Sequence, residues 1–280
     1  GSMDYSLSPS SIPHVQSITV YPGSTLVISS AIAGNPKIID DGGTITFASG
    51  SSGSNITLNV ESGTVNVDSS SVTFTQVNVT SSSAVLAING LSSYSLSNVS
   101  VSGGEIELND SSLSRFSGNV NSGSVVLNDG SSMTVSNLNF EVVVNGGSTI
   151  SLAGNYNSGS SVVMGTGTGN TVLVSTSAAN SDLAISGLAQ GDQIGVVGST
   201  VSSATYTNSS GSGSVSLTTA NGTVYKYTGV SYASDVPSGT STVTATNGSA
   251  AVICFLANSM IRTPEGDRAV EEIRIGNEVS

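Results

Sequence analysis

Apolar residues alternate with Ser, Thr and Asn in short segments along most of the chain. In Thr44–Phe47 and Ile56–Val60 every second residue is apolar, which is the pattern of a strand buried on one face. Segments of this kind recur after a small residue, and successive ones begin 19 to 24 residues apart. Their first residues are Gly23, Gly43, Gly63, Ser83, Gly104, Gly123, Gly147 and Gly169.

Strands that return at a steady interval, with no helical pattern between them, are typical of a solenoid in which each coil buries its apolar face against its neighbours. A second extended segment lies between successive starts. We therefore predict an all-β chain in which residues 4–178 form a right-handed parallel β-helix of about seven or eight coils. A Ser/Thr-rich β-sandwich array is the alternative. In residue composition and repeat length the segment resembles the stalk passengers of bacterial autotransporters and filamentous adhesins.

The interval is lost after residue 178, where hairpin signals begin. Asn221 and Gly222 separate two alternating segments, Val215–Thr218 and Thr223–Tyr227, and Asn-Gly between such segments is a strong signal of a β-hairpin. We predict a β-rich cap over residues 179–250. Such a cap is expected because the last coil of a solenoid otherwise presents unpaired backbone groups.

The chain carries few charges, and most of them are negative. Only 9% of its 280 residues are charged, and 18 acidic against 6 basic residues give a net charge of −12. This balance argues against nucleic acid as a partner, because affinity for phosphate depends on Lys and Arg. It disfavours anionic membrane surfaces for the same reason. No apolar run approaches the length of a membrane span.

The N-terminus and the cysteine content bear on localisation. Gly1–Met3 is typical of a remnant left by tag removal, and we expect any secretion signal to lie outside residues 1–280. The single cysteine excludes an intrachain disulfide. A chain that avoids cysteine so thoroughly fits an extracellular or bacterial cell-surface protein better than a disulfide-stapled domain.

Two carboxylates are candidates for chemistry on the predicted solenoid. Glu105 and Glu107 lie two residues apart on one strand and therefore share a face, and a carboxylate pair can cleave a glycosidic bond. Asp68, Asp110 and Asp129 each follow a predicted strand, where a turn recurs. Asp is common in turns, so the position of these three residues can be explained without a catalytic role. A carbohydrate-binding or polysaccharide-cleaving β-helix is thus the alternative function. We expect neither a metal ion nor a cofactor.

Two tyrosines are candidates for ligand binding in the predicted cap. Tyr225 and Tyr227 share one face of a strand and could stack on a sugar ring. A cross-strand contact within the sheet is the structural alternative.

The last 27 residues differ in composition from everything before them. Three of the six basic residues lie here, at Arg262, Arg268 and Arg274, and the only cysteine, Cys254, stands at the start. Such an abrupt shift marks a domain boundary. We therefore assign residues 251–280 to a separate segment.

The pattern of this segment carries a family resemblance. Phe255–Ile261 is predicted to be a strand, Pro264–Asp267 a turn, and Ala269–Ile275 further extended structure closed by Gly276. Cysteine at a junction followed by this order resembles the opening block of the Hint family, which comprises hedgehog autoprocessing domains, inteins and bacterial intein-like domains.

The resemblance implies an autocatalytic reaction in which the Cys254 thiol attacks the Ile253 carbonyl and converts the peptide bond into a thioester. In the family a later Thr-x-x-His block supplies oxyanion donors and an acid, and residues 255–280 contain no such block. We therefore expect an N-terminal fragment of a Hint-like module that is inactive by itself. A buried, unreactive Cys254 is the structural alternative.

Together these patterns indicate a secreted or cell-surface β-solenoid with an adhesive or structural role, joined to a self-processing module that would cleave at Ile253–Cys254. Surface glycans and cell-surface or matrix components are the expected partners. The sequence leaves the particular ligand and the oligomeric state open.

Overall fold

The computed structural model describes residues 4–6, 16–156, 159–176, 183–244, 250–252, 260–263 and 266–269. Its regular elements are all strands, and the described residues contain no helix long and apolar enough to cross a membrane. The strands are β1 (Asp4–Ser6), β2 (Ser17–Val20), β3 (Thr25–Ile28), β4 (Ala31–Ile32), β5 (Lys37–Phe47), β6 (Ser52–Val67), β7 (Val72–Val79), β8 (Ala84–Asn89), β9 (Tyr94–Asn109), β10 (Ser112–Asn128), β11 (Ser132–Leu138), β12 (Glu141–Val144), β13 (Thr149–Tyr156), β14 (Ser161–Met164), β15 (Thr171–Val174), β16 (Ala184–Leu188), β17 (Gln193–Val196), β18 (Val201–Ser209), β19 (Ser212–Thr219), β20 (Val224–Tyr232), β21 (Gly239–Thr244), β22 (Ala250–Val252), β23 (Met260–Thr263) and β24 (Gly266–Ala269).

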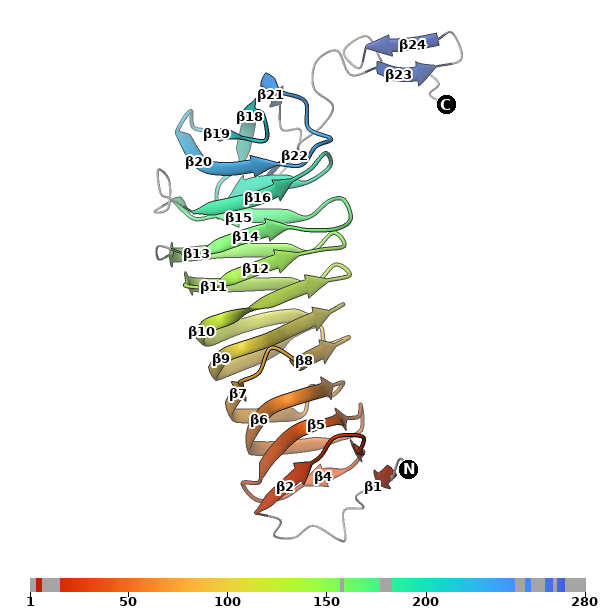
Figure 1. Cartoon of the computed structure of the whole chain (residues 1–280). Coiled ribbons are helices and arrows are strands. Elements are labelled where there is room, and N and C mark those ends of the chain that lie inside the picture. Colours follow the sequence, from red (N-terminus) through yellow and green to blue (C-terminus); the bar gives the residue numbers. More distant parts are fainter. Residues whose placement is uncertain are drawn as a thin grey trace.

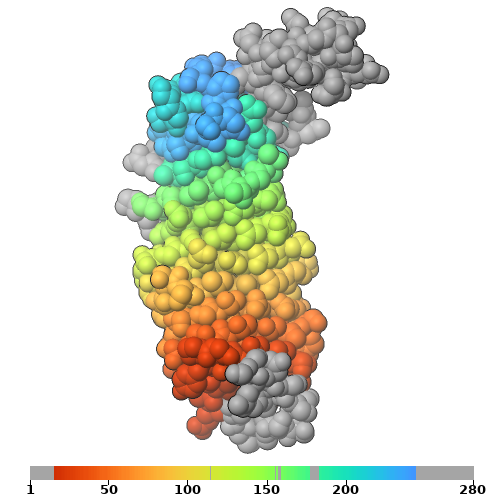
Figure 2. Space-filling view, turned by 45° about the vertical axis from the view of Figure 1, so that its right-hand side comes forward, coloured from red at the N-terminus to blue at the C-terminus, as the bar shows by residue number. Residues whose placement is uncertain are grey.

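The strands stack in parallel into a rod (Figure 1). Ile45 of β5 lies between Leu26 of β3 and Val65 of β6, and the same relation continues from coil to coil up to β16 and β17. The chain is therefore a right-handed parallel β-helix of about eight turns, and the predicted fold class is confirmed. In Figure 2 the coils follow one another in sequence order as bands along the rod.

Each coil has three faces. Face 1 contains β3, β8, β12, β14 and β16, face 2 contains β4, β11, β13, β15 and β17, and face 3 begins with β2. The long strands β5, β6, β9 and β10 run around the corner from face 3 to face 1 without a break. Alternate side chains point inward and form one continuous apolar core, in which the rings of Phe47 and Phe74 meet edge to face with centroids 5.6 Å apart.

Glycines form a column at the corner between face 3 and face 1. A Cβ atom on Gly63 would lie 2.4 Å from the carbonyl oxygen of Gly43, and one on Gly123 would lie 2.2 Å from that of Gly104. No side chain fits such distances, so the coils at Gly63 and Gly123 lie directly on the coils below because glycine stands there. The glycine that begins these two predicted segments therefore has a structural cause.

The predicted starts at Gly147 and Gly169 belong to another face than the six before them. Face 1 continues from Ser124 to Glu141, a step of 17 residues, whereas the strand after Gly147 stacks on Ser132 of face 2. The eight starts therefore fall on two different faces of the rod. Both faces alternate apolar and polar residues in the same way, so the interval alone could not separate them.

A ladder of amide side chains follows the corner between face 1 and face 2. Asn109 donates to Oδ1 of Asn89 and accepts from Nδ2 of Asn128, both at 2.9 Å. Asn145 extends the ladder upward with a 3.0 Å bond to Asn128. The carboxylate of Asp68 closes the lower end by accepting from Asn89 at 2.8 Å. Because every amide donates in the same direction, each one is paired on both sides.

The residue after each ladder asparagine turns the chain. Gly90, Asp110, Asp129 and Gly146 all have positive φ, with values of 64°, 49°, 56° and 62°. Aspartate tolerates this left-handed conformation better than most side chains. The interpretation of Asp110 and Asp129 as turn residues, made from their spacing, is therefore confirmed.

Antiparallel strands close the upper end of the rod. β18 pairs with β19 and β21, and β19 pairs with β20 across the predicted Asn221–Gly222 turn, where Gly222 has a φ of 85°. Parallel stacking extends beyond residue 178, through β16 and β17. β22 then pairs antiparallel with β17, so part of the last parallel edge is covered.

Candidate functional site

Glu105 and Glu107 share the outer side of face 1, as their spacing predicts. Both are half-buried on β9. The neighbours of Glu107 in adjacent coils are Ala87 and Val126, and Glu105 receives only a 3.4 Å bond from the hydroxyl of Ser124. No group of three or more His, Cys, Asp or Glu that could hold a metal ion occurs among the described residues. Glu141 lies in the same column as Glu105, with Ser124 between them, and no basic residue is paired with either Glu105 or Glu107 in the neighbouring strands.

Tyr225 and Tyr227 lie on one face of β20, but they differ in exposure. Tyr225 is half-buried, and Tyr227 is 0% exposed within the core. Burial raises the pKa of the Tyr227 hydroxyl. A ring without exposed surface offers no face to a sugar, so Tyr227 acts as a core residue of the cap and pairs across the sheet with Val215.

Asp40 is a buried carboxylate at an inward-facing position of face 3. Val20 and Val60 hold the corresponding positions in the neighbouring coils. Oδ1 of Asp40 accepts a 2.8 Å bond from the amide of Gly43, and Oδ2 is buried without a hydrogen-bond partner. Burial, assisted by the nearby Asp41 charge, raises the pKa of Asp40 to about 6. The inward direction of the Asp40 side chain depends on the register between coils, which the sequence pattern does not give.

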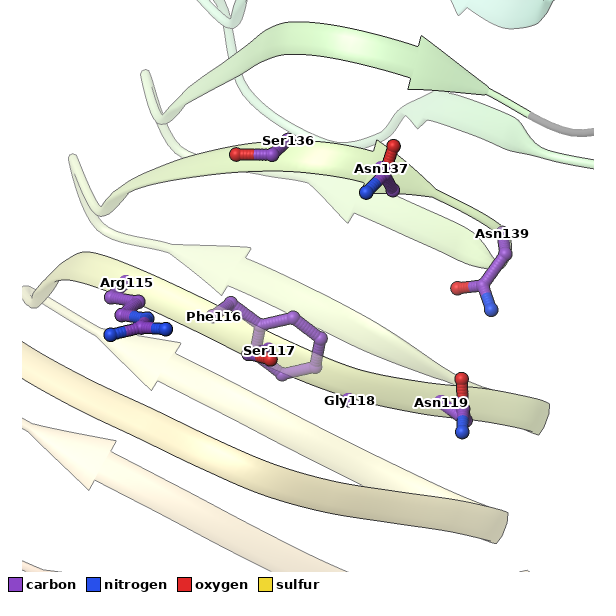
Figure 3. A pocket seen from close by; sticks show the side chains of 8 residues that line it. All are labelled: Arg115, Phe116, Ser117, Gly118, Asn119, Ser136, Asn137 and Asn139. Carbon is purple, nitrogen blue, oxygen red and sulfur yellow. The ribbon is translucent and has the colours of Figure 1, made fainter.

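A surface hollow of about 370 Å³ lies between β10 and β11 (Figure 3). Arg115 lies at one end of it, with Asn119 and Asn139 at the other. The side chains that line the hollow carry a single charge, that of Arg115. The lining residues are Arg115, Phe116, Ser117, Gly118, Asn119, Ser136, Asn137 and Asn139.

The hollow exists because β10 and β11 separate after two residue pairs, Ser112–Ser132 and Leu113–Met133. Beyond that point β10 lies against β9 below it, and a Cβ on Gly118 would be 2.3 Å from the carbonyl oxygen of Val99. β11 instead pairs with β13 above it. The ladders of both strands shift register beside the hollow, and irregularities of this kind are common next to binding sites.

The predicted nucleophile and its scissile bond, Cys254 and Ile253, lie outside the described residues. The strands on either side are described. β22, which ends at Val252, pairs with β17 of the rod, and β23 and β24 form an antiparallel hairpin in a sheet of their own. β23 overlaps the end of the strand predicted over Phe255–Ile261, whereas Gly266 and Asp267, which were predicted as turn residues, belong to β24.

The described residues hold no arrangement of nucleophile, base and oxyanion donors. The hollow is a concave site lined mainly by polar side chains from two strands. One sequence signal marked its position, since Arg115 is the only basic residue between Lys37 and Lys226. The divergence of the two strands carries no such signal. Comparison with protein-family models, curated proteins and solved structures finds no match to this chain.

Proposed function

We propose that the chain is the rod of a secreted or cell-surface protein, with a structural and adhesive role. The observation that carries the proposal is the uninterrupted stack of parallel coils, which displays Ser, Thr and Asn side chains on its outer faces. A solenoid of this kind provides a long, rigid surface on which many contacts can be repeated. Polar side chains on a rigid scaffold suit binding to hydroxyl-rich surfaces such as glycans.

The adhesive role can be separated from polysaccharide cleavage in one experiment. The full chain is applied to immobilised neutral and acidic polysaccharides, and both retention of the protein and release of reducing ends are measured. We expect saturable retention on at least one polysaccharide and no reducing ends. Release of reducing ends that disappears in Glu105→Gln or Glu107→Gln would establish an enzyme instead. Absence of retention on every surface would remove the adhesive role.

A second function, self-processing at Ile253–Cys254, is supported by the position of the junction. β22 ties the residues just before it to the end of the rod, and the β23–β24 hairpin follows it. In the proposed reaction the Cys254 thiolate attacks the Ile253 carbonyl, the peptide C–N bond breaks, and the freed amine takes a proton from an acid. A thiol then attacks the thioester and releases the rod. The proposal requires a Thr-x-x-His block after Ser280.

Replacing Cys254 by alanine is expected to abolish this release. The natural protein, with any residues that follow Ser280, is incubated with a small thiol, and the fragments are weighed by mass spectrometry. We expect a fragment that ends at Ile253, and none from Cys254→Ala, because alanine has no nucleophile. Ser259→Ala, a matched loss of one heteroatom, should cleave normally. An intact natural protein, or cleavage that persists without Cys254, contradicts the proposal.

A further inference from the structure

The hollow between β10 and β11 has the size of a small ligand site and a mainly polar lining. Its volume of about 370 Å³ lies within the range of small-molecule pockets, roughly 300 to 1,000 Å³. Its polar side chains come from two strands, Arg115, Ser117 and Asn119 from β10 and Ser136 and Asn137 from β11. Two walls that converge on one space can contact one ligand from both sides.

Arg115 is an exposed cation on β10. No Asp or Glu is among the residues that line the hollow around it. The full chain is strongly negative, with a net charge of −12. A guanidinium in a hollow whose lining contains no Asp or Glu gives an anion an attractive charge at short range.

The amides around Arg115 suit hydroxyl groups. Asn119 and Asn137 are exposed, and each offers a carbonyl acceptor and an amino donor, which match the paired donor and acceptor character of sugar hydroxyls. The Oδ1 atom of Asn139 is buried without a hydrogen-bond partner. A ligand donor reaches this oxygen only if the amide turns it toward the hollow.

We propose that this hollow binds a carboxylate-bearing sugar unit, in which the Arg115 guanidinium holds the carboxylate and the Asn and Ser side chains of β10 and β11 hold the ring hydroxyls. The planar fork of arginine matches the two oxygens of a carboxylate. The inference rests on the proposed adhesive role and adds its ligand class. In this proposal the hollow is the glycan-recognition site of the rod. The face that carries Glu105 and the tyrosines of the cap do not have that role.

The test uses the full chain and a trisaccharide of galacturonate, with its methyl ester as the matched neutral ligand and a sulfated galactose trisaccharide as a second anion. Binding is measured by titration calorimetry. The protein should bind the acid, and the ester should bind about tenfold to a hundredfold more weakly because a charge-assisted bond is lost. Arg115→Gln should show a similar loss, and Arg115→Lys a smaller one, since lysine lacks the fork.

Two further variants keep the result interpretable. Lys37→Gln changes the net charge by the same amount at another exposed site and should bind like the natural protein. Ser117→Glu places a carboxylate at an exposed position of the lining and should abolish binding by repulsion. Both Ser117→Glu and Arg115→Gln should unfold at the same temperature as the natural chain, because exposed side chains contribute little to stability.

The proposal is overturned if acid and ester bind equally, if Arg115→Gln binds like the natural protein, or if Lys37→Gln weakens binding as much as Arg115→Gln. If the sulfated sugar binds as tightly as the galacturonate, the hollow selects anions in general and has no preference for a carboxylate. That result would overturn the proposed ligand class. A rod that is retained on polysaccharides with no contribution from Arg115 would refute this inference alone. A rod retained on none would refute the adhesive role as well.

Discussion

Gly104→Ala is expected to destabilise the centre of the rod by about 2 to 5 kcal/mol. Gly104 has a φ of 76°, and a Cβ atom there would lie 2.2 Å from the carbonyl oxygen of Ala84 in the coil below. The left-handed conformation costs a non-glycine residue about 1 to 2 kcal/mol, and overpacking adds roughly 1 to 3 kcal/mol. Hydrogen exchange of the amides of β8, β9 and β10 measures the effect, because coils of a solenoid can open locally.

Gly130→Ala is the matched control for this substitution. Gly130 also has a φ of 76°, but no heavy atom lies within 4 Å of the Cβ position. Its replacement should cost only the conformational part, about 1 to 2 kcal/mol. The difference between the two variants therefore isolates the contact between coils. Equal losses in both would show that glycine is needed at the corner for its conformation and not for close stacking.

Asp40 is expected to make the rod more stable in mild acid than at neutral pH. Its pKa is about 6 in the folded protein and 3.8 in the reference state. The folded state therefore binds the proton more tightly, and stability is greatest below about pH 4. It falls as the pH rises from about 4 to 6, by about 3 kcal/mol in total, because each pKa unit corresponds to about 1.4 kcal/mol. Urea unfolding at pH 4.5 and pH 8 measures the change.

Asp40→Asn should remove most of this dependence. Asparagine keeps the oxygen that accepts from the amide of Gly43 and carries no charge into the core, so the variant should be more stable than the natural chain at pH 8 by about 2 kcal/mol. Asp110→Asn, at an exposed turn with a φ of 49°, makes the same chemical change in solvent and should retain the natural pH profile. Identical pH profiles for Asp40→Asn and the natural chain would contradict the assignment.

Sequence periodicity predicts the solenoid because each coil repeats the same physical requirements. Inward positions must be apolar, the corner at Gly63 and Gly123 has no room for a side chain, and the turns after Asn109 and Asn128 require a positive φ. These requirements are local and leave a mark on every repeat. The hairpin at Gly222 is predictable for the same reason.

The features that the sequence does not predict depend on how strands of different coils pair with one another. The step from Ser124 to Glu141 moves later strands to another face without changing their pattern. Tyr227 has the same alternation as a surface residue but faces the core. The hollow at Arg115 arises where two adjacent strands each prefer their other neighbour, and no single segment of the sequence contains that preference.

The one-way amide ladder bears on how such a rod can change its length. Each asparagine presents a donor downward and an acceptor upward, so the junction above Asn89 is chemically the same as the junction above Asn109. A second copy of residues 90–109 inserted after Asn109 would meet complementary partners at both seams and bring its own corner glycine. Tandem duplication of a single coil therefore lengthens the molecule by one strand spacing, about 4.8 Å. The length of the rod can thus change in fixed steps, by evolution or by design.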